Sequence, residues 1–154
     1  MDWYFTLKTL HILSAAILFG TGLGIAFFMY AARFAENLHQ KYYAARFTVL
    51  ADFIFTLPAV ILQPLTGFLL IIEGGYSFHD TWIIRSSALY LLVGLCWIPV
   101  VFIQIRLRNM LRHAIDNDTS LPANYTKLFR IWFLLGWPAF AGVVGIFYLM
   151  VAKP

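Results

Sequence analysis

The chain has 154 residues, of which 62% are hydrophobic and only 12% are charged, with a formal net charge of +4. Soluble domains carry about 25% charged residues, so this composition excludes an ordinary soluble domain and indicates an integral membrane protein. The basic residues flank apolar runs and do not form a stripe, which argues against nucleic acid as a partner. The one cysteine, Cys96, cannot form an internal disulfide.

Four apolar runs follow one another along the chain, at about residues 3–31, 47–73, 82–105 and 129–151. Each is long enough to cross a bilayer, which takes about 20 mostly apolar residues in a helix. The first run exceeds the roughly 7–15 residues of a signal-peptide core, so we expect it to remain as a helix. A backbone in lipid must satisfy its own hydrogen bonds. We therefore predict an all-α, antiparallel four-helix bundle that forms a single transmembrane domain over residues 1–154.

Lysine and arginine residues are divided unevenly between the two ends of this predicted bundle. The links after the first and third runs hold or border eight of them, while the opposite end has three, Lys8, Arg85 and Lys153. Cytoplasmic loops are enriched in lysine and arginine. We therefore expect both basic links in the cytoplasm and both termini on the periplasmic side of a bacterial inner membrane.

The first run contains a histidine, His11, about 12 Å below the outer end of its helix at 1.5 Å per residue. Ionisable side chains inside a membrane are costly and are candidates for functional sites. Polar residues of the second and third runs recur at helical spacing and should face the other helices. At the depth of His11, the residues expected around it are Ser14 on its own helix, then Gln63, Thr66, Tyr90, Gly142 and Gly145.

A neutral imidazole is a common axial ligand of haem iron, and small residues beside it would leave room for a flat ring. This pattern leads to the hypothesis of a haem b site with His11 as the metal ligand. The second ligand stays open between His79 and Met150, with a five-coordinate site or a site shared across a homodimer as further alternatives. The structural alternative is a hydrogen bond from His11 to Tyr90 or to a backbone carbonyl.

A second candidate, Asp52, lies one to two turns from the cytoplasmic end of the second run. One interpretation is an ion pair with Arg46, Arg106 or Arg130 that holds the helix ends together. The other is a proton-accepting group within the membrane.

Four short stretches resemble those of an uncharacterised bacterial family of predicted four-helix integral membrane proteins: residues 7–12 (LKTLHI), 19–22 (FGTG), 63–67 (QPLTG) and 136–138 (GWP). A looser similarity, through the Leu-Lys-x-Leu-His pattern, is to HemJ-type membrane protoporphyrinogen oxidases. That similarity implies haem b on His11, oxidation of a porphyrinogen and a quinone or other electron acceptor. The lysine that follows the second helix in that family has no counterpart between Glu73 and Thr81.

The leading functional hypothesis is a small haem b protein for electron transfer or quinone-linked redox chemistry. Its expected partners are the lipid bilayer, a quinone or redox protein, and a second copy of the chain. The first alternative is a proton-coupled carrier of a small solute that uses Asp52 and the polar stripe. The second is a non-catalytic membrane subunit or assembly factor.

Overall fold

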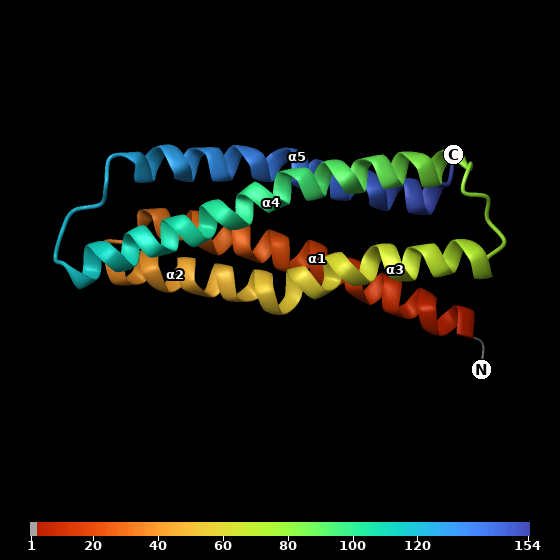
Figure 1. The fold of residues 1–154 in the computed structure, drawn as a ribbon, viewed down its shortest axis with the longest axis horizontal. Helices are drawn as coiled ribbons and strands as arrows, with labels where there is room; N and C mark the ends of the chain where they lie inside the picture. Colours follow the sequence, from red (N-terminus) through yellow and green to blue (C-terminus); the bar gives the residue numbers. More distant parts are fainter. Residues whose placement is uncertain (1–2) are drawn as a thin grey trace.

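The computed structural model describes residues 3–154, and that part of the chain contains helices and turns but no strands. The helices form long antiparallel rods (Figure 1), so the predicted all-α bundle is confirmed. Four rods of the described residues are long and apolar enough to cross a membrane. In chain order the segments are α1 (Trp3–Ala31), η1 (Ala32–Phe34), α2 (Leu38–Ala51), η2 (Asp52–Thr56), α3 (Leu57–Glu73), α4 (Thr81–Asp116) and α5 (Asn124–Ala152).

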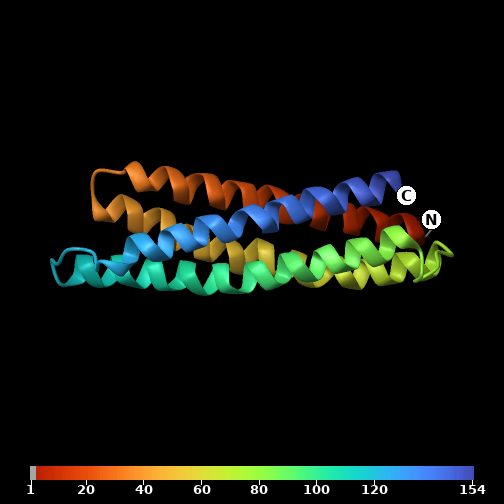
Figure 2. The same ribbon diagram turned by 90° about the horizontal axis from the view of Figure 1, so that it is seen from above.

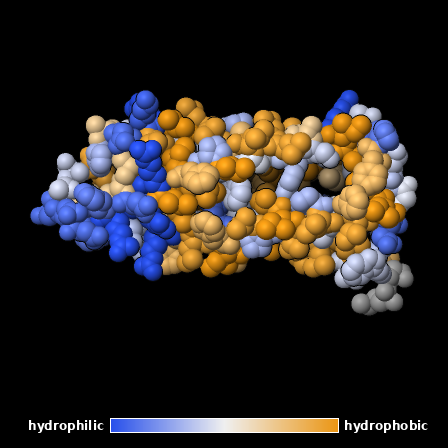
Figure 3. Space-filling model, in the orientation of Figure 1, coloured by the Kyte–Doolittle hydropathy of each residue, from blue (hydrophilic) through white to orange (hydrophobic). Residues whose placement is uncertain are grey.

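Two of the rods extend well beyond the apolar runs. The continuous rod α2–η2–α3 and helix α4 have 36 residues each, or about 54 Å at 1.5 Å per residue. The hydrocarbon core of a bilayer is only about 30 Å thick. The additional turns lie at the end of the bundle where hydrophilic residues gather (Figure 3). Hydropathy shows where lipid contact ends, but the helical backbone continues past that point.

The rod α2–η2–α3 is interrupted by the π-helical turn η2, directly before Pro58. Proline has no N–H group and its ring crowds the carbonyl four residues earlier, so the preceding turn widens. The N–H of Leu57 accordingly bonds to the carbonyl of Asp52, five residues back. Both Asp52 and Thr56, at the ends of this turn, are buried.

Helix α1 begins and helix α5 ends at the same end of the bundle (Figure 2). We call this the outer end, and the opposite end, with the links after α1 and α4, the inner end. Lys153, which follows α5, contacts the link between α3 and α4: its ammonium group donates a hydrogen bond to the Tyr76 hydroxyl at 2.7 Å. The same ammonium lies 5.2 Å from the centre of the Trp82 ring and lowers the pKa of the Tyr76 hydroxyl.

The two halves of the bundle are packed differently. The inner half surrounds a buried cluster of Met29, Leu107, Phe129 and Trp132. In the outer half α1 packs on α3 and α4 packs on α5, whereas α3 and α4 have little direct contact. Figure 3 shows the surface hollowed between these two pairs. We call this hollow in the surface of the outer half the outer hollow.

Candidate functional site

Four of the predicted site residues lie together between α1 and α3. His11 Nδ1 is 2.8 Å from Thr66 Oγ1. The Gln63 side-chain amide donates to the His11 carbonyl at 2.7 Å and to Ser14 Oγ at 2.6 Å. Ser14 in turn donates to the same carbonyl at 3.1 Å. We call these four residues the His11 network, and it connects the two helices at the depth predicted from the sequence.

The hydrogen bonds of Thr66 determine which nitrogen of His11 carries the proton. The Thr66 hydroxyl lies 2.6 Å from the Leu62 carbonyl and has one hydrogen to donate. With that hydrogen on the Leu62 carbonyl, the hydroxyl accepts a hydrogen bond from the Nδ1–H of His11. In the neutral ring the lone pair then lies on Nε2, the nitrogen free to act as a base or a metal ligand.

Gly67 lets the imidazole ring lie close to the backbone of α3. A Cβ atom at this position would be 3.3 Å from His11 Cε1, closer than most side chains tolerate. The ring is thus held on one edge by Thr66 and lies over the α3 backbone at Gly67. This arrangement orients the side chain before any ligand is present.

Three other predicted neighbours are not brought to the imidazole. Tyr90 donates to the Val60 carbonyl on α3, at 2.5 Å, so it bonds to a backbone carbonyl one turn from Gln63 and not to His11. Gly142 and Gly145 face α4, where added Cβ atoms would meet Val93 at 2.6 Å and Leu89 at 3.1 Å. These glycines allow α4 and α5 to pack closely, as small residues do in membrane bundles. They make no room beside His11.

The two candidates for a second iron ligand differ in their surroundings. His79 is exposed in the link between α3 and α4, and its backbone N–H donates to Ser77 Oγ. Met150 is half-buried in the last turns of α5. Among residues 3–154, no three His, Cys, Asp or Glu side chains gather into a metal-binding group.

Asp52 lies in a second buried polar cluster, at the π-helical turn. The side chains of Thr56, Trp97 and Gln104 surround its carboxyl group, and Trp97 Nε1 is 3.4 Å from Oδ1. We call these four residues the Asp52 cluster. Three of its buried oxygens, Asp52 Oδ2, Thr56 Oγ1 and Gln104 Oε1, have no hydrogen-bond partner.

The predicted ion pair of Asp52 with an arginine is not formed. Arg46, Arg106 and Arg130 are exposed. Within residues 3–154, the one ion pair joins Arg112 to Asp116 at 3.5 Å on the inner part of α4. Asp52 directly follows α2, which packs against α4, and its carboxyl group lies beside Trp97 and Gln104 of α4. Trp97 and Gln104 are seven residues apart and so lie on one face of α4.

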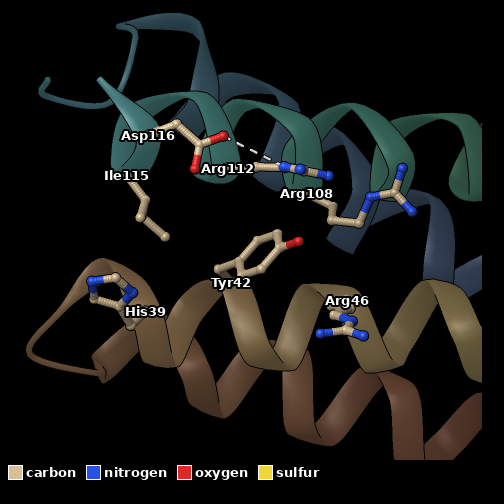
Figure 4. Close-up of a pocket in the computed structure, with 7 residues that line it drawn as sticks. All are labelled: His39, Tyr42, Arg46, Arg108, Arg112, Ile115 and Asp116. Carbon is tan, nitrogen blue, oxygen red and sulfur yellow. Dashed lines mark ion pairs between the residues drawn. The ribbon is translucent and has the colours of Figure 1, made fainter. Parts of the chain in front are cut away.

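A basic pocket of about 560 Å³ lies at the inner end between α2 and α4 (Figure 4). It was not predicted from the sequence, although the spacing of its residues on each helix is that of one helical face. Its guanidinium groups would favour an anionic group such as a lipid phosphate. The lining residues are His39, Tyr42, Arg46, Arg108, Arg112, Ile115 and Asp116.

Comparison with known proteins identifies the family but no activity. No curated protein and no solved structure matches the chain, and the looser similarity to HemJ-type oxidases gains no support. The family model of DUF2269, described as a predicted integral membrane protein, matches residues 5–154. With the four apolar rods, this match shows that the chain is an integral membrane protein and belongs to the DUF2269 family.

Proposed function

We propose that this protein binds one haem b through His11 and carries electrons within a bacterial inner membrane. The observation behind the proposal is the hydrogen bond between His11 Nδ1 and Thr66, which leaves the Nε2 lone pair free. Histidines that bind metals commonly donate their other N–H group to such a partner, which sets the tautomer and the ring orientation.

Two further features fit a haem group. The outer hollow between the pairs α1–α3 and α4–α5 is at the end of the bundle where His11 lies. The three side chains that accompany His11 in its network, Ser14, Gln63 and Thr66, are all uncharged. When bound, haem b supplies a centre for one-electron transfer, with a quinone as a suitable membrane-soluble acceptor.

The residues of the His11 network have separate tasks in this proposal. His11 binds the iron, and Thr66 orients the imidazole by accepting its Nδ1–H. Gln63 and Ser14 hold the backbone of α1 at the His11 carbonyl. One histidine ligand is the simplest arrangement, and the candidates for a second are Met150, half-buried near the outer end of α5, and His79, exposed in the link between α3 and α4.

The test is the absorption spectrum of the protein purified in detergent after expression with added haem precursor. We expect a Soret band and a pyridine haemochrome typical of haem b in the wild type. His11→Ala should lose the haem, and His113→Ala should retain it, because His113 is exposed on the inner part of α4. A wild type without a Soret band, or a His11→Ala variant that keeps its haem, would disprove the proposal.

A further inference from the structure

We propose that Asp52, Thr56 and Gln104 form a site within the membrane for one monovalent cation, held as a proton on Asp52 or as a sodium ion among the three side-chain oxygens. This site is independent of the haem proposal, since it lies on other elements and uses none of the residues of the His11 network. It gives a function to Asp52, a carboxyl group buried within a membrane-spanning rod.

The first argument is burial without hydrogen bonds. The side chains of Asp52, Thr56 and Gln104 are 3%, 4% and 2% exposed. Asp52 Oδ2, Thr56 Oγ1 and Gln104 Oε1 have no partner, although buried polar atoms in proteins are nearly always paired. Each unpaired buried oxygen costs about 1–3 kcal/mol. All three lie around one carboxyl group, so a proton or a sodium ion placed there would have three oxygens to bind.

The second argument is charge. The side chains that face Asp52 are neutral: Thr56 from η2 and Trp97 and Gln104 from α4. The buried residues of the inner half of α1 are Ile25 and Met29, which are apolar. Of the titratable groups on the helices packed here, Arg46 and Arg106 are exposed, Arg108 lines the basic pocket and Cys96 is half-buried. A lone carboxylate in this position is costly unless it is neutralised.

The third argument is the kind of cation that the oxygens suit. Carboxylate, hydroxyl and amide oxygens are ligands for hard cations and accept hydrogen bonds from a protonated group. One positive charge makes the Asp52 site neutral. A divalent ion would leave an excess positive charge in the membrane, with a large desolvation cost. The single carboxylate therefore selects a proton or a monovalent metal ion.

The cation would enter from the outer hollow. Tyr90 and Trp97 both point from α4 toward the α2–η2–α3 rod, where they bond to Val60 and Asp52. Gly94 lies between them on the same face of α4, and an added Cβ there would have no atom within 4 Å. On the inner side, Arg46 and Arg108 lie at the near end of the basic pocket (Figure 4) and would repel a cation.

The experiment is labelling of the purified protein by dicyclohexylcarbodiimide, which adds to protonated carboxyl groups in apolar surroundings. Labelled peptides are identified by mass spectrometry over a pH series, in sodium chloride or in choline chloride. We expect Asp52 to be labelled at low pH and progressively less as the pH rises. At fixed pH, protection by sodium but not by choline identifies a sodium ion as the occupant, while equal labelling in both salts identifies a proton.

Three variants keep the result interpretable. Asp52→Asn should lose the label and retain the haem spectrum of the wild type, which separates this site from the proposed function. Thr56→Val should require several-fold more sodium for the same protection if sodium is bound, whereas Thr66→Val, in the His11 network, should not. The proposal is overturned if Asp52 is unlabelled at every pH and sodium leaves the thermal unfolding midpoint unchanged, or if labelling does not depend on pH.

Discussion

The His11 network and the Asp52 cluster each combine a titratable side chain with a threonine and a glutamine, but more of the buried oxygens lack a hydrogen-bond partner in the Asp52 cluster. In the His11 network, Thr66 and Gln63 make hydrogen bonds from α3 to α1. In the Asp52 cluster, the oxygens of Thr56 and Gln104 have no partner. His11 and Gln63 are half-buried and hydrogen-bonded, whereas Asp52 and Gln104 are almost fully buried and each has an oxygen without a partner.

The difference follows from the backbone. The helices α1 and α3 approach closely at Gly67, so short side chains can reach across. At η2, Asp52 and Thr56 lie beside Trp97 and Gln104 of α4, and Asp52 Oδ2, Thr56 Oγ1 and Gln104 Oε1 have no hydrogen-bond partner. A complete network makes a region rigid, while an incomplete one is costly and has capacity for a ligand. The His11 network therefore positions a side chain, and the Asp52 cluster is suited to bind a cation.

The largest contrast should come from replacing the two threonines by valine. Thr66→Val leaves the His11 Nδ1–H without an acceptor, which should lower the free energy of unfolding by about 1–3 kcal/mol. Thr56→Val removes a hydroxyl that has no partner, so stability in a sodium-free buffer should be unchanged or higher. Thermal unfolding in detergent measures both. Equal destabilisation by the two substitutions would mean that the clusters do not differ as described.

The affinity for haem provides a second comparison of Thr66→Val with Thr56→Val. Loss of the hydrogen-bond partner of a metal-binding histidine commonly weakens metal binding by about 10- to 100-fold. Thr66→Val should therefore release haem more readily in a titration with a competing haem-binding protein, and Thr56→Val should not. Unchanged haem affinity in Thr66→Val would argue against Thr66 as the residue that orients His11.

The two glutamines should give a smaller contrast of the same kind. Gln63→Leu removes two hydrogen bonds between α1 and α3, and such bonds contribute about 0.6 kcal/mol each in membrane proteins, so about 1 kcal/mol should be lost. Gln104→Leu replaces a buried amide whose carbonyl has no partner, and should be neutral or stabilising. The same unfolding assay tests this. A more harmful Gln104→Leu would show that Gln104 has a structural partner.

Much of the His11 network could be predicted from the sequence because it depends on depth and helical face. Counting 1.5 Å per residue placed Gln63 and Thr66 level with His11, and the polar periodicity placed them on the inner face. Depth and helical face can both be counted from the sequence when a helix is straight and its direction across the membrane is known. The hydrogen bonds confirm that these residues meet.

The remainder depends on contacts that periodicity does not contain. Gly142 and Gly145 have the right depth but face α4, because the rotation of α5 is set by packing against Val93 and Leu89. An arginine partner was one interpretation of Asp52, but its neighbours are Trp97 and Gln104, which the positions of α2 and α4 bring beside it. The basic pocket needs α2 and α4 to run side by side past the apolar runs, which hydropathy does not indicate.

The smallest contrast concerns the backbone beneath the imidazole. Alanine in place of a helical glycine generally stabilises by about 0.5–1 kcal/mol, and Gly20→Ala should show this gain because its new Cβ would meet no atom within 4 Å. At Gly67 the new Cβ would be 3.3 Å from His11 Cε1, so the ring must move by a few tenths of an ångström and much of the gain is lost. Stability should then change little, but the Soret band of haem-loaded Gly67→Ala should shift while that of Gly20→Ala stays unchanged. Gly67→Ala moves the ring that is proposed to bind the iron but leaves the Thr66 hydroxyl and the Gln63 amide in place. If the Soret band shifts in neither variant, the position of the ring does not affect the haem, which argues against His11 as the iron ligand.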